Sequence, residues 1–449
     1  MLIYIAKKEI LEHIKSFRFI AAFLFIIVTF FLMMFTRNID YKAKYGDYLL
    51  RVQNQETALD KYAYINRIGW LTKPIAPPST MEIIVDPAVT SDLVDESSRS
   101  LDEDPFNTTS IDLDIIALVG MLGSLLALIL SYDSVNREVH EGTLRLLLSS
   151  AVPRIKVIYG KILGGAIAAI LPIAVILIFT SIWLAISGGL GWGWNQWGSF
   201  LVISLISIIY VMFFYCLGVF LSSVILDQTL SALSCFAVWI LFVLVIPVIG
   251  PYIANSAVRV PNRIAVQRQL LIYEAERDAE IQRSRATLIA QGLSVAEALE
   301  KINIDEIIQR WLERRDALHD NYKIAVTRRT KVAIRLACVS PYSMYLFAVE
   351  ELSGLGIERF QYLETAMKDW NQKFAEFAQK KGVEAQRLNP AFAFSGKIDL
   401  SGMTPFKYIE PDFSSKFSNA ILYILPLLGY FLIPLFLFLF AFNSKRTLL

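Results

Sequence analysis

The sequence predicts an all-α polytopic membrane protein with six transmembrane helices and a large, mostly helical external domain between the fifth and sixth spans. Of its 449 residues, 55% are hydrophobic and only 19% are charged, and the mean hydropathy is +0.49. An ordinary soluble domain has about 25% charged residues. The apolar residues are gathered in six uninterrupted blocks, each about long enough to cross a bilayer core of about 30 Å as a helix.

The six apolar blocks are the expected membrane spans. No acidic or basic side chain stands in the central part of any block, and Arg18 lies only at the rim of the first. The first block is not a cleaved signal peptide, because a helix-like stretch precedes it and no small-residue cleavage site follows it. The spans comprise residues 17–36, 115–132, 162–186, 200–226, 230–251 and 417–442.

The orientation of the spans follows from the basic residues near their ends, which favour the cytoplasmic side. The loop after the third span has no charge and contains tryptophans suited to an outer interface. The chain is therefore expected in the plasma (inner) membrane, with both termini in the cytoplasm. The basic residues expected as membrane-surface anchors are Lys7, Lys8, Lys15, Arg154, Lys156 and Lys161.

Residues 1–16 predict an amphipathic helix that lies along the inner membrane surface. Lys7, Lys8 and Lys15 fall on the polar face. A merely polar flank is the alternative. The face expected to be apolar comprises Leu2, Ile3, Ala6, Ile10, Ile14 and Phe17.

Two long polar segments are expected outside the membrane. The first, residues 37–114, begins as a helical continuation of the first span. The second, residues 252–416, contains apolar positions at three- and four-residue spacing, which predict a helical hairpin from about residue 270 to residue 332. A further helix around residues 357–377 has an aromatic stripe, for which core packing is favoured over a ligand site. Residues 443–449 form the expected cytoplasmic tail.

The sequence lacks the residues that several classes of chemistry require. Gly160 and Lys161 are followed by an isoleucine, so no Walker A motif binds Mg²⁺ there. The three histidines are isolated, and no metal site or catalytic residue is expected. A net charge of +2 gives no basis for binding nucleic acid. The spans contain no carboxylate of the kind that marks ion-coupled pumps, so energy for uphill transport must come from another subunit.

The most informative segment is the loop 133–161 between the second and third spans. We expect a helix over 133–150, in which Glu141 and Arg145 form an i,i+4 pair and Arg137, Glu138 and Glu141 face water. An ordinary surface linker is the alternative. Composition alone does not separate such a linker from a docking element, whose residues would be Arg137, Glu138, Glu141, Gly142, Thr143, Leu144, Arg145 and Leu148.

The motifs in this loop resemble the signature of ABC-2 type transporter permeases, the membrane subunits of type V ABC exporters. The matching residues are Glu141-Gly142-Thr143-Leu144, Leu147-Leu148-Ser149, Pro153-Arg154 and Gly160-Lys161. The resemblance implies that two copies of a separate ATPase subunit, which hold ATP and Mg²⁺, contact this loop. It also implies a second permease subunit, identical or paralogous. The long segments 37–114 and 252–416 resemble the subgroup with enlarged external domains.

The leading hypothesis for function is the membrane subunit of an ATP-driven exporter. The alternative is a mechanotransmitter, in which ATP hydrolysis drives the external domain to act on an envelope partner without any substrate crossing. A receptor is disfavoured, because it predicts an appended signalling domain for which the short tail leaves no room. In either leading case the rigid spans transmit motion, and Pro247, Gly250 and Pro251 are expected to break the fifth helix at its outer end.

Overall fold

The computed structural model describes residues 2–59, 63–64, 81, 114–142, 154–187, 193–292, 303–388, 397–398, 402–404, 406 and 409–444. The chain divides into two compact units, which are described separately. The first comprises Met1–Ser91, Thr109–Val245 and Ser340–Leu449, and the second comprises Asp92–Thr108 and Ile246–Val339. The residues expected to form one external domain, 252–416, are therefore divided between the two units.

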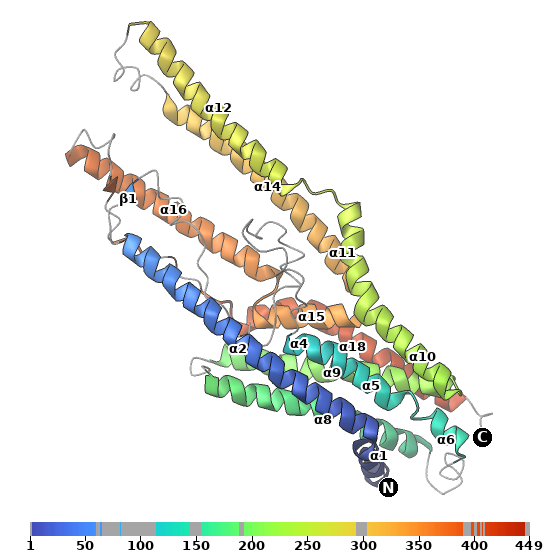
Figure 1. Ribbon diagram of the computed structural model, residues 1–449. Helices are drawn as coiled ribbons and strands as arrows, with labels where there is room; N and C mark the ends of the chain where they lie inside the picture. The colour runs from blue at the N-terminus through green and yellow to red at the C-terminus, as the bar shows by residue number, and fades with distance from the viewer. Residues whose placement is uncertain are drawn as a thin grey trace. The chain divides into compact units, whose positions relative to one another are not determined.

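The first unit is built almost entirely of helices (Figure 1). Its one described pairing of strands is a short antiparallel bridge between β1 (Ala63–Tyr64) and β2 (Lys397–Ile398). The helices are α1 (Leu2–Lys15), α2 (Phe17–Leu59), α4 (Ile115–Leu118), η4 (Val119–Gly123), α5 (Ser124–Ser131), α6 (Asn136–His140), α8 (Arg154–Ser187), α9 (Trp194–Val224), α10 (Gln228–Trp239), η6 (Ile240–Val245), α15 (Pro341–Ser353), α16 (Ile357–Leu388) and α18 (Phe413–Ser444).

The prediction of six spans is confirmed, since six helices in the described residues are long and apolar enough to cross a membrane. The first span continues as one helix, α2, to Leu59, which also confirms the expected helical continuation. At about 1.5 Å per residue, its 43 residues measure about 65 Å, twice the thickness of the hydrocarbon core. The spans are Phe17–Gln53, Ile115–His140, Tyr159–Ile186, Trp194–Val224, Gln228–Ala257 and Phe413–Phe440.

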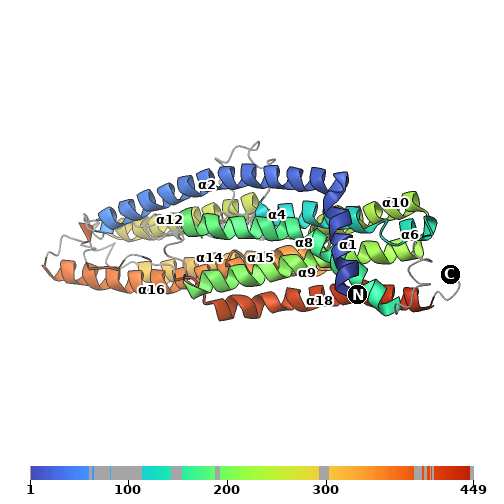
Figure 2. The same cartoon turned by 90° about the horizontal axis from the view of Figure 1, so that it is seen from below.

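Helix α9 is the centre of the first unit, where it packs against α5, α8, α15 and α18 (Figure 2). Small residues permit this close packing, because Cβ atoms added at Gly123, Gly165 or Gly218 would meet side chains of neighbouring helices. Tyr210 and Phe214 of α9 are fully buried. The apolar residues of this helix are thus shared between the protein core and the lipid-facing surface.

Helix α15 is an element that the sequence pattern does not predict. With 13 residues it is too short to span a membrane, yet nearly all of it is buried. Ser340 caps its first turn by accepting hydrogen bonds from the N–H groups of Tyr342 and Ser343, and Pro341 occupies the first helical position. Tyr345 stacks on Tyr210 and shares a hydrogen bond with Ser207 of α9. Buried aromatic contacts therefore fix α15 against α9.

The fifth span does not break at Pro247–Pro251, contrary to expectation. Helix α11 (Ile246–Ala257) runs through Pro251, and the irregularity is the π-helical stretch η6 just before it. Pro247 has no N–H to offer the carbonyls four and five residues earlier, which include that of Phe242. The hydroxyl of Ser340 donates a hydrogen bond to that carbonyl. A wider helical turn and a side-chain donor thus replace the expected break.

The second unit contains the predicted helical hairpin, formed by α12 (Arg263–Ala290) and α14 (Ile304–Ala337) (Figure 1). Two ion pairs join the helices, Arg310 with Glu280 at 2.8 Å and Arg314 with Glu276 at 3.7 Å. The guanidinium of Arg277 on α12 lies 4.6 Å from the ring centroid of Trp311 on α14. Cross-helix pairs of this kind fix the register of the two helices.

The aromatic stripe of α16 packs as core, as expected. Met367, Trp370 and Phe374 are buried, and the rings of Trp370 and Phe374 are stacked. The indole N–H of Trp370 donates to the carbonyl of Thr404, 3.0 Å away. This side of the helix is therefore filled by the chain itself.

Candidate functional site

Three charged side chains from three separate helices meet at the end of the first unit that bears α1. The amine of Lys161 on α8 lies 2.6 Å from a carboxylate oxygen of Glu9 on α1 and 2.8 Å from one of Glu138 on α6. Their side chains are only 14%, 8% and 9% exposed. Charges removed from water in this way remain stable only when they are paired, so the three helices are linked through one amine.

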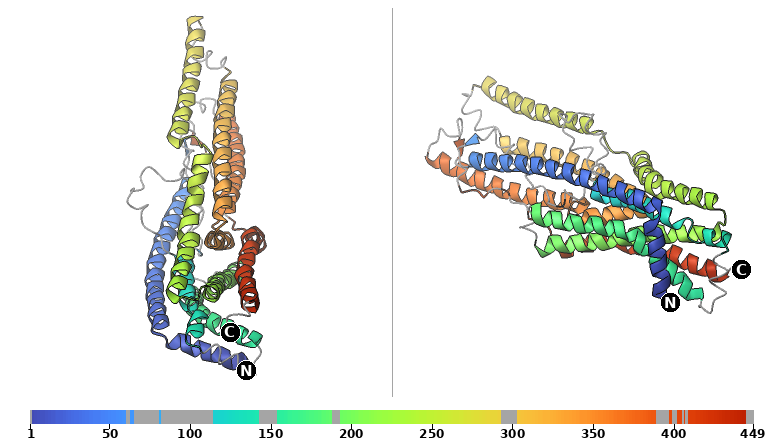
Figure 3. Two further views of the ribbon diagram at one scale, coloured as in Figure 1. Left: turned by 90° about the vertical axis from the view of Figure 1, so that its right-hand side faces the viewer. Right: turned by 60° about the horizontal axis from the view of Figure 1, so that its bottom comes forward.

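Close backbone approach brings Glu9 to Lys161. Helix α1 runs in a different direction from α2 and packs against α8 (Figure 3). At the crossing, a Cβ added to Gly164 would lie 2.6 Å from the Cβ of Glu9 and 2.7 Å from the carbonyl oxygen of Ala6. Glycine is therefore required at position 164 for α1 to lie this near.

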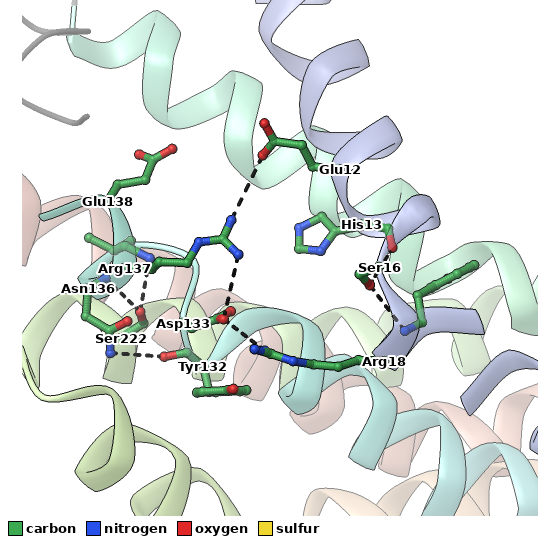
Figure 4. Close-up of polar contacts among 12 residues, drawn as sticks. Glu12, His13, Ser16, Arg18, Tyr132, Asp133, Asn136, Arg137, Glu138 and Ser222 are labelled. Atoms are coloured by element: carbon green, nitrogen blue, oxygen red, sulfur yellow. Dashed lines mark hydrogen bonds and ion pairs between the residues drawn. The ribbon is translucent and has the colours of Figure 1, made fainter. Parts of the chain in front are cut away.

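A second group of ion pairs lies beside the first and centres on the buried carboxylate of Asp133 (Figure 4). Arg18, at the start of α2, donates to it at 2.9 Å, and Arg137 of α6 approaches it to 3.9 Å. Arg137 also reaches Glu12 of α1 at 4.0 Å. We call the residues of the two groups other than the exposed Glu12 the polar junction. They are Glu9, Arg18, Asp133, Arg137, Glu138 and Lys161.

The turn that carries Asp133 is held by hydrogen bonds from neighbouring helices. The hydroxyl of Ser222 on α9 accepts from the N–H groups of Val135 and Asn136, at 3.0 and 3.2 Å. Ser231 on α10 donates to the carbonyl of Tyr132 at 2.8 Å. The two bonds to Ser222 satisfy N–H groups at the start of α6, which otherwise lack partners. The polar junction is thereby fixed to the fourth and fifth spans as well.

Helix α6 ends where the chain becomes exposed. Glu138 is buried, whereas His140 and Glu141 are exposed. Gly142 follows with a φ of +75°, a conformation that glycine adopts without steric cost. A buried, fixed segment thus leads directly into an exposed end.

The structure corrects two expectations for this loop. Glu138 does not face water, because it pairs with Lys161 below the protein surface. The expected continuous helix over 133–150 is interrupted, since α6 ends at His140 and Gly142 turns the chain away. Glu141 therefore lies just beyond the end of α6. Thr143, Leu144, Arg145 and Leu148 lie outside the described residues.

The expected membrane-surface anchors fall into different environments. Lys7, Lys8 and Lys15 are exposed on α1, whereas the buried amine of Lys161 is held by two carboxylates. Arg154 and Lys156 lie in α8, but their side chains are outside the described residues.

The expected apolar face of α1 also differs from the packed one. Ile5, Ala6 and Glu9 are buried, whereas Ile3 and Phe17 are 80% and 84% exposed. Sequence reasoning missed Glu9 and Asp133. Both had a signal: Glu9 lies at helical spacing from Ile5 and Ala6, and Asp133 directly follows an apolar block. A carboxylate in either place predicts a buried partner.

His13 adds a titratable group at the edge of the polar junction. Its imidazole lies 3.8 Å from a carboxylate oxygen of Glu9. Burial lowers the pKa of His13 below its ordinary value of 6.5, although the Glu9 carboxylate opposes this shift. His13 is therefore mainly neutral at pH 7.

A family model described as an ABC-2 family transporter protein matches residues 3–445, nearly the whole chain. No curated protein sequence matches the chain.

Proposed function

Since the chain belongs to the ABC-2 family of transporter proteins, we propose that it exports a substrate with energy supplied by a separate ATPase subunit. Membership of the family makes it a permease subunit of an ABC transporter. Export, the ATPase partner and its docking place are the proposal. ATP and Mg²⁺ are held by the partner, and two ATPase copies serve this chain and a second permease subunit.

The observation that carries the proposal is the continuity between the polar junction and the exposed residues after it. His140 and Glu141 are exposed and follow Glu138 within one turn of α6. A partner that binds there acts on a helix whose buried end is paired with α8 and, through Lys161, with α1. The docking segment then continues into residues 143–153, as the family resemblance implies.

Buried ion pairs make this connection rigid. Removing one partner of a buried pair costs about 3–5 kcal/mol, because the remaining charge is left without compensation. A displacement of α6 is therefore less costly if α1 and α8 move with it. Different affinity of the ATPase dimer for the two arrangements supplies the energy of the shift.

The proposed orientation places this end of the protein in the cytoplasm. Lys7, Lys8 and Lys15 on α1 are exposed, in agreement with an inner membrane surface. Both termini then lie in the cytoplasm and the hairpin α12–α14 lies outside the plasma (inner) membrane.

A second candidate function is mechanotransmission, in which the hairpin acts on an envelope partner and no substrate crosses. The length of the hairpin favours it, because α12 and α14 have 28 and 34 residues and their charged side chains are paired across the two helices. Transport into sealed vesicles separates the two functions, since only an exporter moves a solute.

The test of the proposal is co-purification with a Walker A ATPase encoded beside this chain. Gly142→Val forces a branched side chain into a left-handed conformation, so it is expected to reorient the docking segment. We expect loss of ATPase association and of stimulated hydrolysis. Glu141→Lys, which reverses an exposed charge, is expected to weaken association.

The matched control is Gly292→Val. Gly292 also has a positive φ, of +92°, and open space around it, but it lies at the end of α12. It is expected to leave association unchanged. Equal association of all three variants, with normal membrane expression, would contradict the docking role.

A further inference from the structure

The hairpin of the second unit begins at the end of the fifth span, which fixes its depth relative to the membrane. A Cβ added to Gly250 would lie 2.9 Å from the backbone nitrogen of Ala337, the last residue of α14. Ala254 and Ala333 are also buried. The last turns of α14 therefore run beside the last turns of the apolar span Gln228–Ala257.

The part of α14 that lies at this depth is basic. Residues 321–337 contain no acidic residue. Arg328, Lys331 and Arg335 are all exposed and, at spacings of three and four, lie on one face of the helix. They extend over about 10 Å along the axis. The opposing stretch 255–273 is similar, with the exposed Arg259 and Arg268 and no acidic residue.

The distal half of the hairpin has a different charge pattern. Residues 274–292 and 304–320 contain interspersed acidic and basic residues, several of which are paired with one another, such as Arg310 with Glu280. Cations are therefore segregated toward the end of the hairpin at the fifth span. Stability of a helical hairpin does not require such segregation, because like charges repel.

We propose that Arg328, Lys331 and Arg335, with Arg259 and Arg268, bind the phosphate groups of anionic lipids in the leaflet at this end of the fifth span. We name these five residues the basic collar. A lipid surface is favoured over a soluble partner because α11, the end of the fifth span, exposes apolar side chains. Val248 and Tyr252 are 70% and 76% exposed, as suits acyl chains and the interfacial layer.

The charges of the collar match this location. The polar layer of each leaflet is about 5–7 Å thick, less than the length over which the α14 cations extend. Long Arg and Lys side chains make up the difference, because their charged ends reach toward the polar layer while their stems lie on apolar surface. Anionic lipids are attracted to such clusters by Coulomb interaction with each cation. This inference needs only the six-span membrane architecture, so it stands independently of the ATPase partner.

The test uses the full-length chain in vesicles of phosphatidylcholine, with spin-labelled phosphatidylglycerol and phosphatidylcholine as probes in separate samples. The fraction of immobilised probe gives the preference for the anionic lipid. We expect Arg328→Gln with Lys331→Gln to lower that preference by up to about thirtyfold. The single variant Arg328→Lys, which keeps the charge at 328 and the native Lys331, is expected to retain the preference for the anionic lipid.

The matched control is Arg283→Gln with Arg285→Gln, which removes two cations from the distal half of α12. It is expected to leave the preference unchanged. An equal loss in both double variants, or no loss in either, would overturn the proposal. Inorganic phosphate tests the other source of the same chemistry: abolition of the preference by phosphate, but not by chloride at equal ionic strength, would show an anion site instead of a lipid surface. Elution profiles of the variants verify folding.

Discussion

The amine of Lys161 lies 2.6 Å from a carboxylate oxygen of Glu9, although 152 residues separate them in the chain. The pair joins the first helix of the protein to the beginning of the third span, and Glu138 extends the connection to α6. The loop after the second span, the N-terminal helix and a membrane span are thus connected by buried charges. The proposed coupling rests on this relationship.

Replacing Lys161 by methionine leaves Glu9 and Glu138 without the cation that they share. We expect a loss of about 3–5 kcal/mol in stability, seen as a lower thermal midpoint of the detergent-solubilised protein. The triple variant Glu9→Gln, Lys161→Met, Glu138→Gln is expected to be more stable than Lys161→Met alone, because neither buried carboxylate of this group is then left without its cation. A triple variant less stable than the single one would show that the ion pairs are not the cause.

Gly164→Ala is expected to displace α1 from α8. The added methyl group would lie 2.6 Å from the Cβ of Glu9, which is closer than carbon atoms pack, and overpacking of this kind costs about 1–3 kcal/mol. Thermal midpoints measure the effect. Gly429→Ala in α18 is the control, because nothing lies within 4 Å of a Cβ there. If the two variants melt alike, α1 does not approach α8 as described.

Acidification is expected to weaken the docking of α1. Because burial lowers the pKa of His13 below 6.5, the folded state favours the neutral imidazole. The stability from this group is complete above pH 6.5 and is lost as the pH falls through that value toward the lower folded-state pKa. His13→Gln should therefore reduce the difference between the thermal midpoints at pH 7.5 and 5.5. His140→Gln, at an exposed position, should leave the difference unchanged.

Ser340→Ala removes two functions of one hydroxyl. It deprives α15 of its N-cap and the carbonyl of Phe242 of its donor, so a loss of about 1–3 kcal/mol is expected. Ser340→Thr keeps the hydroxyl and should retain most of the stability. Ser181→Ala, which removes an exposed hydroxyl in α8, serves as the control. A thermal midpoint for Ser340→Ala equal to that of the control would contradict the assigned role.

The sequence predicts the spans and the hairpin because both depend on local pattern. Twenty apolar residues in a row indicate a membrane helix whatever surrounds them, and helical spacing identifies α12 and α14. Helix α15 is not predicted, because a helix of 13 residues is too short for a span and because its burial arises from contacts with α9 and α18. The continuation of the helix through Pro251 is not predicted either, because the donor that compensates Pro247 comes from Ser340, distant in sequence.

The candidate site is predicted only in part, for a related reason. Arg137, Glu138 and Glu141 were identified from the loop, but helical periodicity alone could not show that Glu138 has a partner on α8. Glycine after His140 and Glu141 is a usual signal for a helix end. The expectation of a helix over 133–150 did not take that signal into account. The positive φ of Gly142, directly after the end of α6, is the conformation that the signal indicates.

Photo-crosslinking from position 141 in living cells tests the central claim most directly. A benzophenone amino acid at Glu141, which is exposed beside the polar junction, is expected to form a covalent product with a Walker A ATPase subunit. The same amino acid at Gln282, exposed on α12, is expected to form none. An ATPase product from position 282, or none from position 141 in an active cell, would contradict the account.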